Sequence, residues 1–366
     1  MIARGANSGM KLPRSWLPPA LGFIGISAAL LAWASLDVQL VSDGATPISS
    51  PVPKLSSVAY ILHEPLVDRV QVQKAEPGAV PQTLAMFKVP LGLHAHGSVS
   101  PDGQTILVLH GVAEPGRAAL SVVNVSTGRI DALFSPVDFQ TNIVWDRDGK
   151  TVAVGRSLPP DDVGRVQTEI FSIDTETKIE SHIATFDSVF EAAPVGFLED
   201  SMLVVTIDQS GSALTRVTDG KAAKVAQLSV GRTRGWTLHP DGVRLAFLDV
   251  IGAGAGRAVV AKVILLSTGQ ITSLPGEDDH FGIVWRPGLD IPDIGGPGGS
   301  VQLSDSEGST TPVHPISWAP DGSRLLVQVP SGSQGQAGHL EILSNDTRLW
   351  LVEGEIVPLG WVADVQ

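Results

Sequence analysis

The sequence predicts an all-β chain, a β-propeller of six blades with seven as the alternative, preceded by one N-terminal hydrophobic helix. Three observations predict it. A strand–turn–strand unit recurs along the chain, and each copy closes on Asp-Gly or Gly. The steps between copies fit one or two repeats of about 40 to 45 residues, the length of a four-stranded blade. Only the N-terminal segment has the length and hydropathy of a membrane-directed helix.

The hydrophobic segment carries no charge between Arg14 and Asp37. The run of 22 residues from 15 to 36 is long enough to cross a bilayer as a helix. Basic residues precede it and acidic residues follow it, so the positive-inside rule leaves the N-terminus in the cytoplasm. We therefore expect residues 1–14 to be a short cytoplasmic n-region and residues 15–36 to be a transmembrane signal anchor or a signal peptide.

The choice between anchor and signal peptide stays open. Pro18 and Pro19 delay the helix start, and the apolar core left from Ala20 to Leu31 has the length of a signal-peptide h-region. Cleavage near Ala34 would release a secreted protein, whereas an uncut segment gives a single-pass protein of the cell membrane. In both forms the body lies outside. A Pro- and Ser-rich linker is expected at 37–55 and the propeller at 56–366.

The repeat is visible in five segments that share one plan. They are Val99-Ser100-Pro101-Asp102-Gly103, Trp145-Asp146-Arg147-Asp148-Gly149, Leu238-His239-Pro240-Asp241-Gly242, Trp285-Arg286-Pro287-Gly288 and Trp318-Ala319-Pro320-Asp321-Gly322. Pro presets φ, Asp accepts hydrogen bonds from nearby backbone N–H groups, and Gly tolerates positive φ. The pattern predicts hairpin turns, with structural roles for Asp102, Gly103, Asp148, Gly149, Asp241, Gly242, Asp321 and Gly322.

Tryptophans recur at the end of the strand before these turns. A large ring at this position is expected to pack between neighbouring blades and not to form a ligand cage. The residues are Trp145, Trp236, Trp285, Trp318 and Trp361.

The Trp-x-Pro-Asp-Gly segments resemble the repeat of the TolB-like propellers, also called WD40-like Pro-Asp (PD40) repeats. The resemblance covers roughly residues 56 to 366 and recurs with gaps. It implies a propeller of six or seven blades in an extracytoplasmic protein that serves as an interaction platform. It implies no catalytic residues.

The two ends of the predicted ring complement each other. Leu359 to Val362 reads as the opening strand of a blade that nothing follows, and the runs Ser57–Leu62, Val67–Gln73 and Thr83–Val89 precede the first full repeat. We expect these runs to complete that blade and close the ring. The Gly-, Pro- and Ser-rich segment Asp290–Val313 is either a loop within a blade or the remnant of a seventh blade.

Composition excludes several functions. The formal charge of −13 argues against a nucleic-acid partner, because phosphate binding needs a basic face. The absence of cysteine excludes disulfides, thiolate metal sites and a Cys nucleophile.

The sequence also lacks two catalytic motifs. No Gly-x-Ser-x-Gly elbow is present, and His63-Glu64 lacks the second histidine of a zinc-protease motif.

Two groups of residues could bind a metal. His94 and His96 alternate along one strand, and Asp278, Asp279 and His280 are consecutive. No ligand that would complete a metal site with either group is identifiable from the sequence, so no metal and no cofactor is predicted. The predicted function is a non-catalytic, extracytoplasmic module that binds a protein, peptide or glycan and contacts the membrane through its N-terminal helix. The alternative is a hydrolase or lyase whose site is assembled in the central channel from several blades.

Overall fold

The computed structural model describes residues 55–364, apart from 65–66, 115, 134–135, 161, 163–165, 188, 253–255, 277–278, 305–309, 332–336 and 345–346. The predicted n-region, hydrophobic segment and most of the linker therefore lie outside the described residues. Within the described part, the chain forms strands and turns and no α-helix, so none of its elements is a helix fit to span a membrane.

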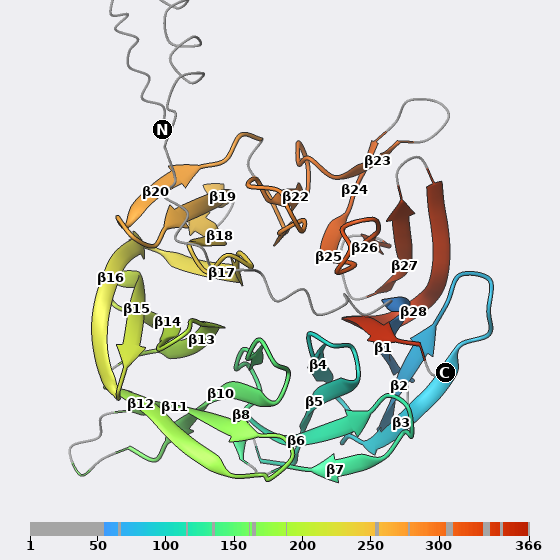
Figure 1. Cartoon of the computed structure of the whole chain (residues 1–366), viewed down its shortest axis with the longest axis horizontal. Coiled ribbons are helices and arrows are strands. Elements are labelled where there is room, and N and C mark those ends of the chain that lie inside the picture. Colours follow the sequence, from blue (N-terminus) through green and yellow to red (C-terminus); the bar gives the residue numbers. More distant parts are fainter. Residues whose placement is uncertain are drawn as a thin grey trace, which may run out of the picture. The chain divides into compact units, whose positions relative to one another are not determined.

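Antiparallel sheets follow one another around a ring (Figure 1). Four of them are separate sheets of four or five strands, each built from consecutive strands. The first contains β4 (Ala95–Val99), β5 (Thr105–Gly111), β6 (Arg117–Asn124), β7 (Ile130–Ala132) and β8 (Val137–Asp138). The second contains β9 (Val144–Trp145), β10 (Thr151–Leu158), β11 (Gln167–Asp174) and β12 (Glu180–Asp187). The third contains β13 (Glu191–Phe197), β14 (Met202–Asp208), β15 (Gly211–Thr218) and β16 (Lys221–Ser229). The fourth contains β17 (Arg232–Leu238), β18 (Arg244–Ile251), β19 (Ala258–Leu265) and β20 (Gln270–Ser273).

A seven-stranded sheet joins the two ends of the chain. Its order is β25-β26-β27-β28-β1-β2-β3. Its strands are β25 (His314–Trp318), β26 (Leu325–Pro330), β27 (Ala337–Ser344), β28 (Thr347–Ala363), β1 (Leu55–His63), β2 (Arg69–Ala75) and β3 (Gln82–Lys88). Residues 347–355 of β28 pair with β27, and residues 356–363 pair with β1. The prediction that the N-terminal runs complete the last strand of the ring is confirmed.

Two short sheets lie between β20 and β25 along the chain. Their strands are β21 (Gly282–Val284) with β22 (Asp293–Gly295), and β23 (Gln302–Ser304) with β24 (Thr310–Pro312). The Gly- and Pro-rich composition of Asp290–Val313 explains their length, because Pro removes ladder donors and Gly contributes no side chain to pack.

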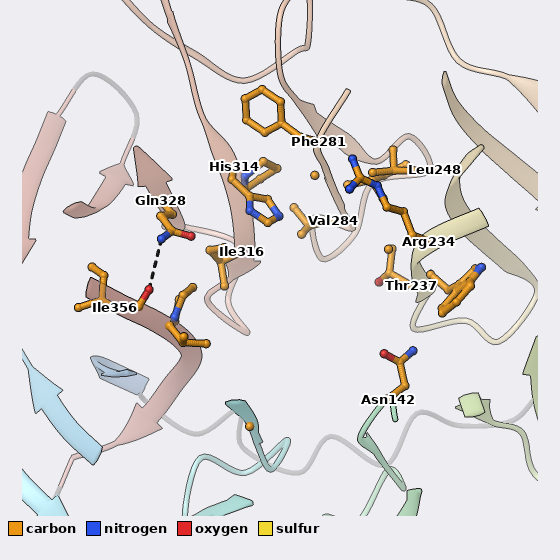
Figure 2. Close-up of a pocket in the computed structure, with 18 of the residues that line it drawn as sticks. Asn142, Arg234, Thr237, Leu248, Phe281, Val284, His314, Ile316, Gln328 and Ile356 are labelled. Carbon is orange, nitrogen blue, oxygen red and sulfur yellow. Dashed lines mark hydrogen bonds between the residues drawn. The ribbon is translucent and has the colours of Figure 1, made fainter. Parts of the chain in front are cut away.

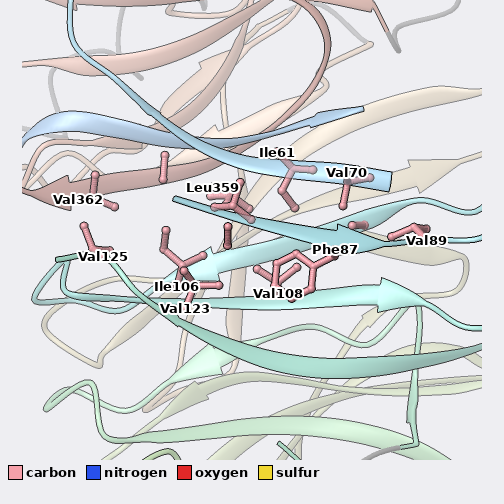
Figure 3. Close-up of a cluster of buried hydrophobic side chains, with 14 residues drawn as sticks. Ile61, Val70, Phe87, Val89, Ile106, Val108, Val123, Val125, Leu359 and Val362 are labelled. Atoms are coloured by element: carbon pink, nitrogen blue, oxygen red, sulfur yellow. The ribbon is translucent and has the colours of Figure 1, made fainter. Parts of the chain in front are cut away.

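The hydrophobic core is divided among the junctions between neighbouring sheets. Seven clusters of buried residues follow one another around the ring, each drawing residues from two consecutive groups of strands. Figure 3 shows the cluster in which Ile61 and Val70 meet Ile106, Val108 and Val123. Burial between sheets is what holds adjacent blades of a propeller together.

The hairpin connectivity gives the ring two distinct faces. The innermost strands β4, β9, β17 and β25 each end at one of the repeated turns, so the turns at 100–104, 146–150, 239–243 and 319–323 lie on one face, which we call the turn face. The segments that lead into the innermost strands, including 90–94, 139–143 and 230–231, lie on the opposite face, the loop face. The first residues of the innermost strands therefore surround the channel at its loop-face mouth.

Candidate functional site

The turn residues singled out in the sequence lie in tight turns on the turn face. Asp102 Oδ1 accepts a hydrogen bond from Gln104 N at 3.0 Å, and Asp241 Oδ1 accepts one from Val243 N at 2.8 Å. Asp321 makes the corresponding bond with Ser323 N. The glycines at 103, 149, 242 and 322 all have φ between 68° and 72°. That region of φ favours glycine over any residue with a side chain.

The second copy of the turn departs from this plan. Asp146 Oδ1, and not Asp148, accepts the N–H groups of Lys150 and Thr151, at 2.9 and 3.1 Å. Asp148 is exposed. The role assigned to Asp148 from the repeat is therefore filled by the aspartate two residues earlier.

The tryptophans lie in the clusters between sheets, with Trp285 and Trp361 in the buried part and Trp145, Trp236 and Trp318 half-buried. Arginines from the preceding group of strands around the ring cover three of the rings. Arg324 lies 4.8 Å from the centroid of the Trp361 ring and Arg286 lies 4.3 Å from that of Trp318. Arg244 lies 5.8 Å from that of Trp285. These are packing and cation–π contacts between blades.

The histidines considered as metal ligands do not converge. His96 Nε2 lies 2.6 Å from the carbonyl oxygen of Phe139, whereas the ring of His94 lies edge-on to that of His63. His280 is buried and its Nδ1 accepts a hydrogen bond from Ala261 N, while its neighbour Asp279 is exposed. Asp278 lies outside the described residues. Among the residues that are described, no three His, Asp or Glu side chains are grouped to hold a metal ion.

A cavity of about 820 Å³ lies in the channel, and many of its lining residues come from the loop-face ends of the innermost strands (Figure 2). Innermost strands from most of the ring line it, and its polar and aromatic lining residues include His63, His94, Asn142, Arg234, Phe281, His314, Gln328 and Glu355. Volumes of this size are typical of sites for small molecules or peptide segments.

One side of the cavity is positively charged. Arg234 on β17 extends into the cavity, and among the described residues no carboxylate pairs with it. Arg234 is exposed to solvent at the cavity, and the desolvation of its covered part and the nearby charge of Arg257 lower its pKa. Burial, followed by the charge of Arg234, lowers the pKa of His314 to about 4, so this imidazole is neutral near pH 7. Phe281 stands edge-on to His314, with ring centroids 6.3 Å apart.

The other side holds two histidines and a carboxylate. The rings of His63 and His94 have centroids 5.3 Å apart, and Glu355 lines the same part of the cavity. Burial and the neighbouring His94 lower the pKa of His63, while Glu355 and a backbone hydrogen bond at Ala95 oppose that shift. These three residues also line a smaller pocket of about 150 Å³, together with the start of β2 and the segment 89–94.

Sequence analysis did not find Arg234, His314 or Glu355. They come from different strands, and nothing in the sequence places them side by side. One signal was available, because Arg234 and His314 each stand seven residues before a turn aspartate, Asp241 and Asp321. In both β17 and β25 this position lies at or near the loop-face end of the strand, next to the channel.

Four buried or half-buried histidines predict a loss of stability in mild acid. Burial lowers the pKa values of His63, His96, His110 and His314 in the folded chain. The unfolded chain, with histidine pKa values near about 6.5, therefore takes up protons first as pH falls. The free energy of unfolding is expected to fall below about pH 6.5, by at most about 1.4 kcal/mol per pH unit for each histidine.

Denaturant unfolding at pH 7.5, 6.5 and 5.5 checks this expectation. His314→Asn should reduce the slope of stability against pH, and His182→Asn, at an exposed position, should leave the slope unchanged. Equal slopes for wild type and His314→Asn would contradict the assignment.

Comparison with known proteins identifies the fold. TolB from Acinetobacter baumannii aligns with 84% of this chain and 67% of its own, at 18% identity and a TM-score of 0.51. A prolyl endopeptidase aligns with 85% of this chain at 11% identity and a TM-score of 0.55. This chain has the β-propeller fold. The prediction of an all-β, TolB-like propeller is confirmed at the level of fold.

The chain spans half of the endopeptidase chain, and 67% of the TolB chain. No protein-family model matches the sequence, and no curated protein matches it.

Proposed function

We propose that the propeller is a non-catalytic binding module and that its ligand, a protein, peptide or glycan segment, enters the cavity at the loop-face mouth of the channel. The observation that carries this proposal is the cavity of about 820 Å³ with polar side chains projecting from separate innermost strands. A propeller presents such side chains on a rigid ring, which reduces the entropy that the protein loses on binding.

The contacts in the cavity favour binding over catalysis. His63 and His94 meet edge to face, and in the described residues no Ser or Thr hydroxyl in the cavity is hydrogen-bonded to a histidine. A nucleophile and a base within hydrogen-bond reach are what acyl transfer requires. The grouping of His63, His94 and Glu355 is the observation that favours the second candidate, a hydrolase or lyase with its site in the channel.

Filling the cavity tests the proposal. Thr237 lies on β17 among the lining residues, and Thr237→Trp should obstruct the channel. Labelled full-length protein is applied to an array of peptides and bacterial glycans. We expect binding that Thr237→Trp weakens at least tenfold and that Thr272→Trp, a matched change at an exposed position of β20, leaves intact.

Two results would count against this function. Array binding that survives Thr237→Trp would place the ligand elsewhere on the ring. Turnover in a panel of hydrolase and lyase substrates, abolished by His63→Asn or Glu355→Gln, would favour the enzyme.

We further propose that the ring lies on the outer side of the cell membrane. The support is the uncharged run 15–36 with its basic flank, which is a targeting pattern. Secretion after cleavage near Ala34 remains the alternative, and the mass of the protein isolated from membranes distinguishes the two. The mass of the full-length chain would support the anchor, and the mass of a chain that starts after Ala34 would support secretion.

We infer that the ring has seven blade positions. The bent strand β28 belongs to two four-stranded groups of the seven-stranded sheet, and β21–β24 occupy a position of their own. Seven hydrophobic clusters, one for each junction, support this count. Six blades were expected first from the sequence, and this proposal takes the alternative of seven, with Asp290–Val313 in the reduced blade.

A further inference from the structure

Arg234 lines the cavity and has no carboxylate partner among the described residues, in a chain of formal charge −13. Some arginines of the ring are held by carboxylates: Arg232 lies 2.7 Å from Glu191, and Arg244 lies 2.7 Å from Asp290. Arg286 and Arg324 instead donate to backbone carbonyl oxygens, of Gly322 and Leu55. Arg257 adds positive charge near Arg234. A guanidinium aimed into a partly apolar cavity binds an anion favourably, because its two parallel N–H groups match the two oxygens of a carboxylate.

The neighbours of Arg234 suit a carboxylate attached to an apolar body. His314 beside it is a neutral imidazole and can donate one hydrogen bond to the anion. Apolar side chains continue the surface away from the charge, and those labelled in Figure 2 are Leu248, Phe281, Val284, Ile316 and Ile356. Glu355 lies in the part of the cavity with His63 and His94, so repulsion from its carboxylate would orient an anionic group towards Arg234.

We propose that the cavity binds a ligand through a carboxylate held by Arg234 and His314, with the apolar part of the ligand packed against Phe281 and Val284. This proposal rests on the proposed binding function and names the chemistry of the ligand. The carboxylate could belong to a free small acid or to the C-terminus of a peptide, and the two sources share the same recognition.

Matched acids and amides separate the charge from the apolar contact. The full chain with isotope-labelled histidine is titrated with 4-methylpentanoate and with 4-methylpentanamide, and with N-acetyl-Ala-Leu and its C-terminal amide. The NMR signal of His314, assigned from its loss in His314→Asn, reports occupancy. We expect at least one acid to bind at least tenfold more tightly than its amide.

Substitutions locate the anion. Arg234→Gln should weaken binding of the acid at least tenfold, and Arg234→Lys should restore part of the loss. Arg129→Gln, which removes an exposed arginine paired with Asp131, is the matched control and should have no effect. A bound carboxylate should also raise the pKa of His314, so affinity should increase between pH 7.0 and 5.5.

Each outcome decides a separate point. Tighter binding of the peptide acid than of 4-methylpentanoate would indicate a chain end, and the reverse would indicate a small acid. Equal binding of acids and amides, unchanged binding in Arg234→Gln, or no binding of any probe would overturn the carboxylate site. If no probe binds but Thr237→Trp still weakens the binding of array ligands, the proposed binding function stands. Only the inference of a carboxylate ligand is then overturned.

Discussion

Replacing Trp361 by Ala is expected to lower the free energy of unfolding by about 3–5 kcal/mol. Trp361 lies where the last strand joins the first, opposite Val58 of β1, and only 4% of its surface is exposed. Its indole N–H donates to the carbonyl oxygen of Ser317 at 3.1 Å, and the guanidinium of Arg324 covers its ring. The substitution therefore creates a cavity and removes a hydrogen bond and a cation–π contact at the closure of the ring.

The same strand provides the control. Trp350 lies nearer the start of β28, is 55% exposed, and pairs with Glu341 of β27. Trp350→Ala is expected to change stability by less than about 0.5 kcal/mol. Trp361→Phe keeps most of the apolar contact and loses the indole donor, so it should fall between the two. Denaturant unfolding measures all three, and equal effects at positions 350 and 361 would show that closure does not depend on Trp361.

The fold could be predicted because its signals are local. A Pro-Asp-Gly turn is specified by the φ that Gly103 or Gly242 must adopt and by a side-chain oxygen within two residues. The repetition of these turns then implies sheets in a ring, and the N-terminal runs, which precede the first full repeat, were expected to complete the last one, as the pairing of β1 with β28 shows. The departure at Asp146 was not predicted, because either aspartate of that turn can reach the same backbone groups.

The candidate site could not be predicted in the same way. Arg234 and Glu355 are 121 positions apart in the sequence and line one cavity only because the ring brings the starts of the innermost strands together. Whether Arg234 is paired also depends on which carboxylates lie near it, and among the described residues that is set by the packing between sheets. His94 and His96 show the converse, because adjacency in the sequence suggested a shared site and the structure directs the two rings apart.

Replacing Lys262 by Met is expected to lower the free energy of unfolding by about 3–5 kcal/mol, because it leaves a buried carboxylate unpaired. Asp249 on β18 is 2% exposed. Its Oδ2 accepts a hydrogen bond from Lys262 Nζ at 2.7 Å, and its Oδ1 is buried with no hydrogen-bond partner in the described residues. The ammonium group of Lys262 therefore balances the charge of the Asp249 carboxylate within the sheet.

The matched control is Lys88→Met. Lys88 pairs with Asp68 at 3.5 Å, but its side chain is 84% exposed, and the loss should be below about 1 kcal/mol. The double substitution Asp249→Leu with Lys262→Met removes both charges and should recover most of the stability, because an apolar pair of similar volume needs no desolvated ions. Denaturant unfolding of the wild type, Asp249→Leu, Lys262→Met and the double substitution gives the coupling between the two positions. If the double substitution is as unstable as Lys262→Met alone, the loss comes from the packing of the Lys262 side chain and not from the unpaired charge of Asp249.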